Sequence, residues 1–504
     1  MADVSHRKFG AALLPLSLEK AGKLPLQRQL FDQLREIILS GRVKPGERFP
    51  STRSLAQELG CSRNTVIAAY DQLYAEGYLE GESGSGTYVS AILPEELLRP
   101  RLSDVPEPEN RKGLPCPELS TLGARLAGLR RKQGTRESAA PARLVGLPET
   151  AFFPWDVWSR LFSRHWRNPK RELIHHGEPG GYPPLRRAIA RYLAVARGLK
   201  CDWRQVIITS GAQQSIDLTL KALTDPGQSC WIEDPGYTGL RGPILSSGLE
   251  MVPVPVDEEG FSLEVAVQRG EASIAIITPS HHYPLGVVMS LPRRLQLLEW
   301  AREKGSFLLE DDYDSEYRYK GRPLTALQSL DRSGSVIYAG SFSKVLFPSL
   351  RLGYLVVPES LADTMIDVRH ALDDHPSSLA QPVLADFFEE GHFAAHLRRT
   401  RFLYQERQEA LIESAKMHLE DLLVVAEDEA GMHLLADLSP SLRKRMNDAE
   451  ASRRAAEAGI AAPALSSYYL RKPARQALLL GYAALDAGDV ETMVRRLAAS
   501  LIRV

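Results

Sequence analysis

From about Leu144 to the C-terminus, short apolar runs alternate with longer amphipathic segments, and this alternation limits the fold more than any other feature of the chain. Stretches with apolar residues at helical spacing, such as 213–222 and 292–304, lie between the runs. Strands that alternate with helices form a mainly parallel sheet covered by helices. We therefore predict a large α/β domain here. Its strand candidates are VIITS (206–210), SCWIE (229–233), AIITP (275–279), FLLED (307–311), VIYAG (336–340) and GYLVVP (353–358).

The chain of 504 residues is too long for a single compact domain. Residues 16–90 show dense helical patterns that end in Gly-rich extended sequence. Residues 91–141 are rich in proline with little apolar periodicity, which is typical of a semi-extended linker. We therefore expect a small domain at 16–90, a linker at 91–141 and the α/β domain at 142–504.

Composition excludes several classes of protein. The formal net charge of -1 gives no sign of nucleic-acid binding, so any such function must rest on local features. The four cysteines are scattered, without a close pair at metal-ligand spacing, so we expect reduced thiols and no metal site. No apolar run approaches the roughly 20 residues that span a bilayer, and the N-terminus has no signal-peptide pattern. These observations predict a cytoplasmic protein without membrane contact.

The small N-terminal part has the pattern of three helices. Apolar residues at helical spacing predict the first helix at 27–40. The second opens at Ser51 and ends at Gly60, and Ser62 caps the third. Two short helices with a Gly-containing turn between them form a helix-turn-helix, whose last helix enters the major groove of DNA.

A β-hairpin is predicted directly after the third helix, and its tip carries two glycines. Polar and basic groups at the helix starts and at this tip can reach phosphates or base edges. The candidate DNA-binding residues are Ser51, Arg53, Ser62, Arg63, Asn64, Thr65, Gly84 and Gly86. Arg63 is the expected base contact. The alternative is a structural three-helix domain with solvated charges, which the hairpin with its glycines disfavours.

Residues 24–89 resemble the winged helix-turn-helix of GntR-type regulators nearly without gaps. The resemblance implies double-stranded DNA as the partner, with a promoter or operator as its target. It also implies phosphate and base contacts at Ser51, Arg53, Arg63, Thr65 and the hairpin glycines.

The segment YAGSFSKVLFPSLRLGYLVVP (338–358) carries the strongest chemical signal in the α/β domain. Lys344 follows a strand and a Ser-Phe-Ser turn, and Arg351 lies seven residues later. A lysine that forms a Schiff base with pyridoxal phosphate needs an anion site for the cofactor phosphate nearby. Ser341, Ser343 and Arg351 supply two hydroxyls and a cation for such a site.

Three earlier segments supply the other contacts that this cofactor needs. In FLLEDDYDSEYRY (307–319), Asp311 suits the protonated pyridine nitrogen and Tyr313 the ring hydroxyl oxygen. In ITSGAQQSIDL (208–218), the backbone N–H groups of Ala212 and Gln213 can cradle the phosphate. Tyr237, in a Pro-Gly turn, can stack on the pyridine ring. A metal site built from the acidic residues 310–314 is the alternative, but no histidine or cysteine cluster accompanies them.

Together these segments resemble fold-type I aminotransferases from about Gly146 to the C-terminus, and a GntR-type domain joined to that fold is typical of the MocR/GabR regulators. The resemblance implies a homodimer in which pyridoxal phosphate forms an internal aldimine with Lys344, held by Asp311, Tyr313, Tyr237 and Arg351. It further implies a transcription regulator that senses an amine or amino-acid effector, or pyridoxal phosphate itself.

The sequence departs from the aminotransferase pattern at three positions. Tyr283 stands where aminotransferases carry an asparagine, and His176 where they carry a tyrosine that reaches the neighbouring subunit. Leu479 occupies the place of the arginine that binds the substrate carboxylate, and neither Arg471 nor Arg475 is assigned to that role. Because this arginine orients the substrate, its loss weakens transamination. A working aminotransferase is the alternative to a regulator. Because of this loss, at most slow half-reactions are expected.

Overall fold

The structure is a computed structural model, and it describes residues 16–19, 24–82, 86–93, 118–132, 145–321 and 324–502. The chain divides into two compact units, Met1–Pro117 and Glu118–Val504. Each unit has its own hydrophobic core and is described by itself.

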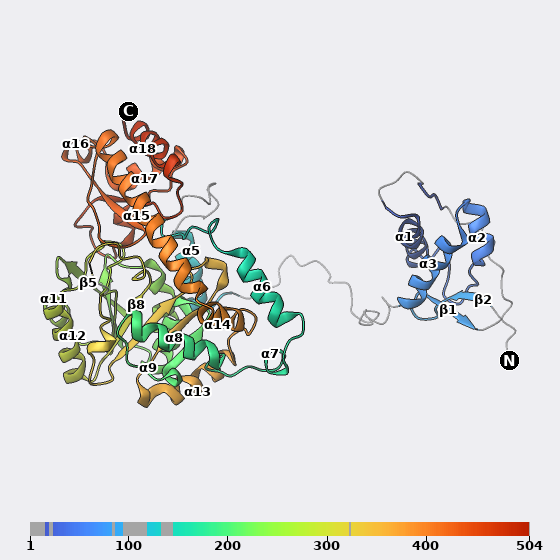
Figure 1. The fold of residues 1–504 in the computed structure, drawn as a ribbon, viewed down its shortest axis with the longest axis horizontal. Helices are drawn as coiled ribbons and strands as arrows, with labels where there is room; N and C mark the ends of the chain where they lie inside the picture. The colour runs from blue at the N-terminus through green and yellow to red at the C-terminus, as the bar shows by residue number, and fades with distance from the viewer. Residues whose placement is uncertain are drawn as a thin grey trace. The chain divides into compact units, whose positions relative to one another are not determined.

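The N-terminal unit contains the predicted winged helix-turn-helix. Its elements are α1 (Leu26–Leu39), α2 (Thr52–Leu59), α3 (Arg63–Ala75), β1 (Leu79–Glu82) and β2 (Gly86–Val89) (Figure 1). The hydroxyl oxygens of Ser51 and Ser62 accept hydrogen bonds from the backbone N–H groups of Ser54 and Thr65, both at 3.1 Å, and so cap α2 and α3. β1 and β2 pair antiparallel and form the wing. The three helices and their caps are therefore confirmed.

The C-terminal unit is built on an eight-stranded sheet with the order β3-β10-β9-β8-β7-β4-β5-β6. The strands are β3 (Val206–Thr209), β4 (Ser229–Asp234), β5 (Glu250–Asp257), β6 (Gly260–Phe261), β7 (Ile274–Ile277), β8 (Phe307–Asp312), β9 (Val336–Ser341) and β10 (Gly353–Val356). The five strands β4, β5, β7, β8 and β9 pair in parallel, whereas β10 and β6 run antiparallel to their neighbours. The predicted, mainly parallel sheet is confirmed, and each of the six predicted strands is present.

β5 and β6 are not among the predicted strands. Pro253 and Pro255 interrupt the apolar run of β5, and proline lacks the N–H group that a central strand uses for pairing. In the structure only Val256 and Asp257 pair with β6, so most of that side of β5 has no strand partner. This is why the prolines are tolerated.

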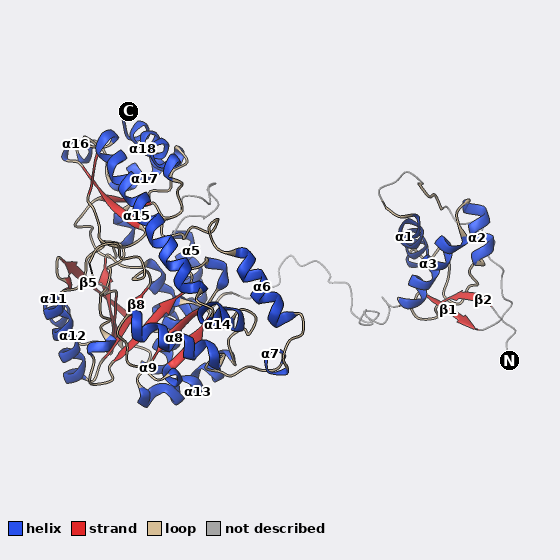
Figure 2. Cartoon of the chain, viewed as in Figure 1, coloured by secondary structure: helices blue, strands red, loops and turns tan. Residues whose placement is uncertain are grey.

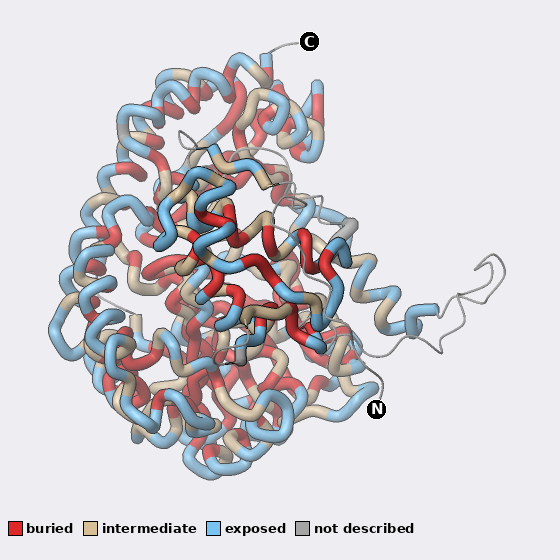
Figure 3. The backbone as a smooth tube through the Cα atoms, turned by 90° about the vertical axis from the view of Figure 1, so that its right-hand side faces the viewer, coloured by how far each residue is buried: buried red, intermediate tan, exposed pale blue. Residues whose placement is uncertain are grey.

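Helices cover both faces of the sheet (Figure 2). One face packs against α9 (Ala212–Leu223), α10 (Arg241–Ser246) and α13 (Ala362–Asp373). The other packs against α6 (Trp155–Trp166), α8 (Pro183–Ala196), α12 (Leu291–Lys304) and α14 (Gln381–Glu389). Figure 3 shows buried and exposed stretches alternating along the backbone. The sheet is therefore buried on both faces, which leaves the ends of its strands as the places for a site.

Residues 392–502, which we call the C-terminal subdomain, form a second, smaller layer. A three-stranded antiparallel sheet packs there against long helices. Its elements are α15 (His392–His418), β11 (Leu423–Val425), β12 (His433–Leu438), α16 (Pro440–Arg443), α17 (Asp448–Glu457), β13 (Ala477–Gly481) and α18 (Ala487–Ile502). The core of this layer includes Tyr317 from the segment that follows β8, so the subdomain is joined to the large sheet by packing.

The predicted linker, 91–141, contains one described helix, α5 (Thr121–Lys132), which packs against α10 of the C-terminal unit. Most of the remaining linker lies outside the described residues, so its boundaries stay a prediction. Within the described ranges, no helix combines the length and the apolar character that crossing a bilayer requires.

We predict that Gly181→Ala destabilises the C-terminal unit. Gly181 has φ +96°, and a Cβ atom there would lie 2.5 Å from Ile208 Cβ in β3. Overpacking and the left-handed backbone should together cost about 2–4 kcal/mol in the free energy of unfolding, measured by denaturant titration. Gly270→Ala is the control, because Gly270 has φ +114° but no atom within 4 Å of a Cβ. Equal losses in both variants would contradict the packing argument.

Candidate functional site

A cavity of about 520 Å³ opens at the carboxyl edge of the large sheet. All nine residues predicted to bind the cofactor line it: Ala212, Gln213, Tyr237, Asp311, Tyr313, Ser341, Ser343, Lys344 and Arg351. The structure thus brings together residues that are up to 139 positions apart in the sequence. Their individual roles stay predictions.

The topology of the sheet explains this convergence. β4, β7, β8 and β9 are parallel, so the segments that follow them leave the sheet at one edge. Asp311 and Ala339 are neighbours in the β8–β9 register, which places the carboxylate close to the turn that carries Lys344. Ligands of open α/β sheets bind at this carboxyl edge.

Lys344 and Asp311 are oppositely charged groups that line the same cavity. The Lys344 ammonium group donates to the carbonyl oxygen of Gly146 at 2.8 Å. Burial, followed by the charges of Asp312 and Asp314, raises the pKa of Asp311 to about 7, although Lys344 opposes this rise. A further cation beside Asp311 would stabilise its ionised form. The arrangement therefore fits a ligand with a protonated ring nitrogen.

The other end of the cavity suits an anion. Ala212 and Gln213 form the first turn of α9, where backbone N–H groups have no partner within the helix. Arg351, in a left-handed conformation with φ 51°, lies beside Gly211, and a Cβ added to Gly211 would be 3.6 Å from the Arg351 guanidinium. Ser341 and Ser343 line the same cavity. These groups fit the phosphate of the predicted cofactor.

Tyr237 lies at the wall of the cavity. Gln213 Nε2 donates to the Tyr237 hydroxyl oxygen at 3.3 Å and to the carbonyl oxygen of Gly239 at 3.1 Å. A Cβ atom on Gly239 would overlap the Tyr237 ring, so glycine is required there for this ring position. The aromatic ring is therefore held in place rather than free to turn.

Several lining residues were not found by the sequence analysis. They are Gly146, Thr278, Asp314, Pro348, Ser349, Met432 and His433. Met432 and His433 come from the C-terminal subdomain, and no local motif marks them. His281 was missed as well: its Nδ1 atom lies 3.0 Å from the Tyr313 hydroxyl oxygen. The histidine pair in SHHYPLG was the one available signal.

Of two departures from the aminotransferase pattern, Tyr283 lies at the cavity and Leu479 does not line it. The hydroxyl group of Tyr283 is hydrogen-bonded to that of Tyr468 at 3.0 Å. Leu479 is fully buried in an apolar cluster. Arg475 forms a two-bond ion pair with Asp437. Among the described lining residues, Lys344 and Arg351 are therefore the only lysine or arginine side chains.

The predicted DNA-binding residues lie at the starts of α2 and α3. Ser51, Arg53, Ser62, Arg63 and Asn64 are exposed, and Thr65 is partly buried. The Arg63 Nε atom donates to Thr52 Oγ1 at 3.5 Å, which places the guanidinium between the two helices. Gly86 begins β2, whereas Gly84 lies outside the described residues.

Arg48 was missed by the sequence analysis. A Cβ on Gly86, which has φ +123°, would lie only 2.8 Å from Arg48 Nε. The side chain of Arg48 therefore lies against the wing and adds a further cation on that side of the domain.

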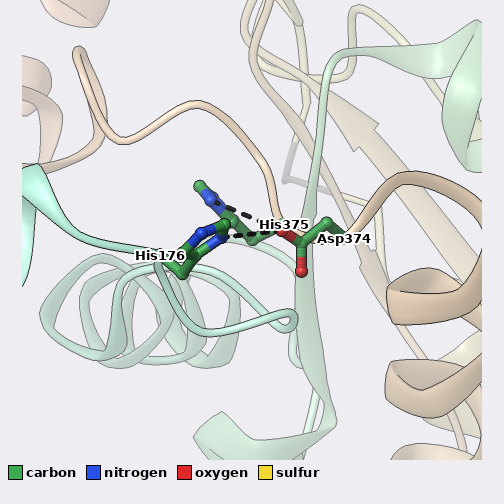
Figure 4. A group of neighbouring side chains, drawn as sticks. All are labelled: His176, Asp374 and His375. Carbon is green, nitrogen blue, oxygen red and sulfur yellow. Dashed lines mark hydrogen bonds and ion pairs between the residues drawn. The ribbon is translucent and has the colours of Figure 1, made fainter.

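His176, Asp374 and His375 form a separate cluster, in which the three side chains point toward one another (Figure 4). The Nδ1 atoms of His176 and His370 each lie 3.0 Å from an Asp374 carboxylate oxygen. These ion pairs lower the pKa of Asp374, with the His176 hydrogen bond as the largest cause. His176 is 88% exposed, and its contact with Asp374 accounts for the arrangement without a metal ion. The expectation that the chain has no metal site stays a prediction.

Comparisons with known families agree with this division of the chain. The family described as bacterial regulatory proteins, gntR family, matches residues 26–89, and the family aminotransferase class I and II matches residues 152–497.

Individual proteins are similar over three quarters of the chain or more. The probable rhizopine catabolism regulatory protein MocR of Rhizobium meliloti is 41% identical over 97% of this chain and 96% of its own length. The HTH-type pyridoxine biosynthesis transcriptional regulator PdxR of Corynebacterium glutamicum is 32% identical over 78% of this chain and 80% of its own. Among solved structures, the alpha-aminoadipate aminotransferase LysN of Thermus thermophilus, complexed with N-(5'-phosphopyridoxyl)-L-leucine, matches with a TM-score of 0.66 and 29% identity. The match covers 76% of this chain and 98% of that one.

We predict that Asp311→Asn stabilises the protein at alkaline pH when it is freed of any bound ligand. The folded state binds the Asp311 proton more tightly than the unfolded state, whose pKa is about 3.9, so stability falls as the pH rises from there to about 7. The variant lacks this fall, and at pH 8 its free energy of unfolding should exceed that of the parent by up to about 4 kcal/mol. Denaturant titrations at pH 5 and pH 8 measure the difference. Asp367→Asn, an exposed position in α13, is the control and should follow the parent at both pH values.

Proposed function

The chain belongs to the MocR-type transcription regulators, which join a GntR-type domain to an aminotransferase-like domain, and from this premise we propose that pyridoxal phosphate bound at Lys344 is its sensor. The observation that best supports this proposal is that Lys344 and the buried Asp311 line the same cavity. The cofactor would supply an electrophilic carbon that reacts reversibly with amines.

The residues of the cavity have separate tasks in this proposal. Lys344 holds the cofactor covalently, and the Asp311 carboxylate holds a proton on the ring nitrogen. Arg351 and the start of α9 bind the phosphate, together with the hydroxyl groups of Ser341 and Ser343. Tyr237 covers one face of the ring, and Tyr313 contacts the ring oxygen.

The effector is an amine or an amino acid, or the signal is the presence of pyridoxal phosphate itself. Both Lys344 and Arg351 are engaged by the cofactor in this proposal, so no lysine or arginine among the described lining residues remains for an effector carboxylate. This favours an effector that does not need a carboxylate clamp. Similarity to a regulator named for pyridoxine biosynthesis supports the second alternative.

The lack of a lysine or arginine for a substrate carboxylate among the described lining residues also argues against transamination as the main activity. Leu479 is buried among Leu465 and Ala477 at the place where aminotransferases carry the clamp. Without this clamp an amino-acid substrate is poorly oriented, and orientation accounts for much of the rate of such reactions. We therefore propose slow half-reactions at most.

Double-stranded DNA is the proposed partner of the N-terminal unit, with Arg63 as a base contact and the capped starts of α2 and α3 near phosphates. We further propose a homodimer that binds two half-sites, arranged as direct or inverted repeats, since each subunit of a dimer carries one DNA-binding domain.

The first experiment compares the visible absorption spectra of the parent and of Lys344→Ala, each with added pyridoxal phosphate. The parent should show a visible band that borohydride removes, because an imine between the cofactor and an amino group absorbs there, and Lys344→Ala should lack it, because the amino group that forms this imine is removed. Lys304→Ala, an exposed lysine in α12, is the control and should keep the band. A band of equal strength in Lys344→Ala would refute the role of Lys344.

The second experiment measures DNA binding by Arg63→Ala. Loss of a base contact should weaken specific binding by about 1–3 kcal/mol, roughly 5- to 150-fold, while the visible band stays intact. Fluorescence anisotropy over a series of salt concentrations separates this effect from a loss of phosphate contacts. Arg28→Ala, in α1, serves as the matched control. Equal binding by Arg63→Ala and the parent at every salt concentration would exclude Arg63 as the base contact.

A further inference from the structure

A buried imidazole lies behind Tyr313, between two carboxylates. His281 Nδ1 is 3.0 Å from Asp314 Oδ2, and His281 Nε2 is 3.2 Å from Asp428 Oδ2. The side chains of His281 and Asp314 are each only 2% exposed. Ionised carboxylates accept hydrogen bonds but cannot donate them, so the imidazole satisfies both only when both of its nitrogens carry protons. The geometry therefore favours the imidazolium cation.

The electrostatics agree with this charge state. Burial alone would lower the pKa of His281, but Asp314 and Asp428 outweigh burial and raise the pKa to about 10. The other titratable groups that face His281 are Tyr313, His282 and His433. Burial, followed by the charge of His281, lowers the pKa of both neighbouring histidines. His281 is therefore the cation of this group at neutral pH.

Two glycines make room for the network. Gly431 has φ +91°, and a Cβ there would overlap His281 Cε1. Gly286 has φ +75°, and a Cβ there would overlap Asp428 Oδ2. The second oxygen of Asp428 accepts from the Ala430 N–H at 3.1 Å. The backbone thus fixes the carboxylate that faces His281.

The charge of His281 decides which way the Tyr313 hydroxyl proton points. His281 Nδ1 lies 3.0 Å from the Tyr313 hydroxyl oxygen as well as close to Asp314. A protonated Nδ1 has one N–H, which is shared between the Asp314 carboxylate and the tyrosine oxygen, and it cannot accept the Tyr313 proton. That proton is therefore left for the Asp314 carboxylate, to which the Tyr313 hydroxyl is also hydrogen-bonded, or for a ligand in the cavity. An unprotonated Nδ1 would instead take that proton. Because Tyr313 lines the cavity, its proton can then reach a ligand.

We propose that His281, held as a cation by Asp314 and Asp428, is a positioning residue that keeps the Tyr313 hydroxyl proton directed at the ring oxygen of the bound cofactor. This inference rests on the proposed function. It also links two layers of the unit, because Asp428 lies between β11 and β12 of the C-terminal subdomain, whereas His281 and Tyr313 follow strands of the large sheet.

The effect can be measured as the pH midpoint of the visible band. A hydrogen bond donated to the ring oxygen reduces the negative charge of that oxygen. The ring oxygen then stabilises less strongly the proton on the nitrogen that joins Lys344 to the cofactor. The midpoint is thereby kept low. A hydrogen bond to a charged group contributes about 1.5–3 kcal/mol, so His281→Asn should raise the midpoint by about 1–2 pH units.

Asp428→Asn is the milder second variant, since it leaves the imidazole and Asp314 in place. It should raise the midpoint by a smaller amount. Glu429→Gln is the matched control, because Glu429 lies in the same loop but pairs with Arg318 rather than with His281. Its midpoint should equal that of the parent.

A double-mutant cycle tests whether the effect passes through Tyr313. In a Tyr313→Phe background, His281→Asn should cause no further shift. The proposal is overturned if His281→Asn and Asp428→Asn titrate like the parent, which would mean that Tyr313 gives its proton to Asp314. It is also overturned if the full shift persists in the Tyr313→Phe background. If the parent protein shows no band that depends on Lys344, the proposed function and this inference are both refuted. The other two outcomes refute this inference alone, because the band is then present.

Discussion

The parallel pairing of β8 with β9 is the constraint on which the C-terminal unit depends. It places Asp311 and Lys344, from segments far apart in the chain, at one edge of the sheet. Ala212, Gln213, Tyr237 and Thr278 follow from the same rule, since β3, β4 and β7 send their next segments to that edge. Helices cover both faces of the sheet, and the cavity lies at the edge where the strands end. The position of the site is thus a property of the topology, and its chemistry is a property of a few side chains.

The four acidic residues around the end of β8 show how that chemistry is divided. The Glu310 carboxylate accepts hydrogen bonds from the backbone N–H groups of Leu327 and Gln328, both at 2.9 Å. Asp312 pairs with the buried Arg197 at 2.7 Å, and Asp314 pairs with His281. Within the described part of the chain, the favourable charge that acts on the Asp311 carboxylate is that of Lys344. Three of the acids are therefore satisfied by the protein, and the proposed function assigns the fourth to a ligand. This arrangement differs from the shared metal site that their spacing also permits.

Much of the fold and of the candidate site could be predicted from the sequence, because the signals were local. The helix caps Ser51 and Ser62, the six apolar strands and the Lys344 segment each lie within a short stretch. The missed parts depend on contacts between distant segments. Asp428 lies 147 residues from His281 and belongs to another layer, so no spacing rule connects them. Pro253 and Pro255 concealed β5, since their tolerance depends on how little of that strand pairs with β6.

The glycines beside His281 have a consequence for how this chain can change in evolution. A side chain at Gly286 or Gly431 would overlap Asp428 or His281, and both glycines adopt positive φ angles that other residues rarely take. Replacing His281 first would leave Asp314 as a buried carboxylate without its cation, whereas replacing Asp428 first would leave His281 paired with Asp314 alone. Loss of His281 or a side chain at either glycine is therefore the costly first step, and a lineage that has acquired the network leaves it through a less stable intermediate unless Asp428 changes first. The network therefore restricts which substitutions this chain can accumulate. Its four positions, Gly286, Gly431, His281 and Asp428, are expected to change together, or to begin with Asp428.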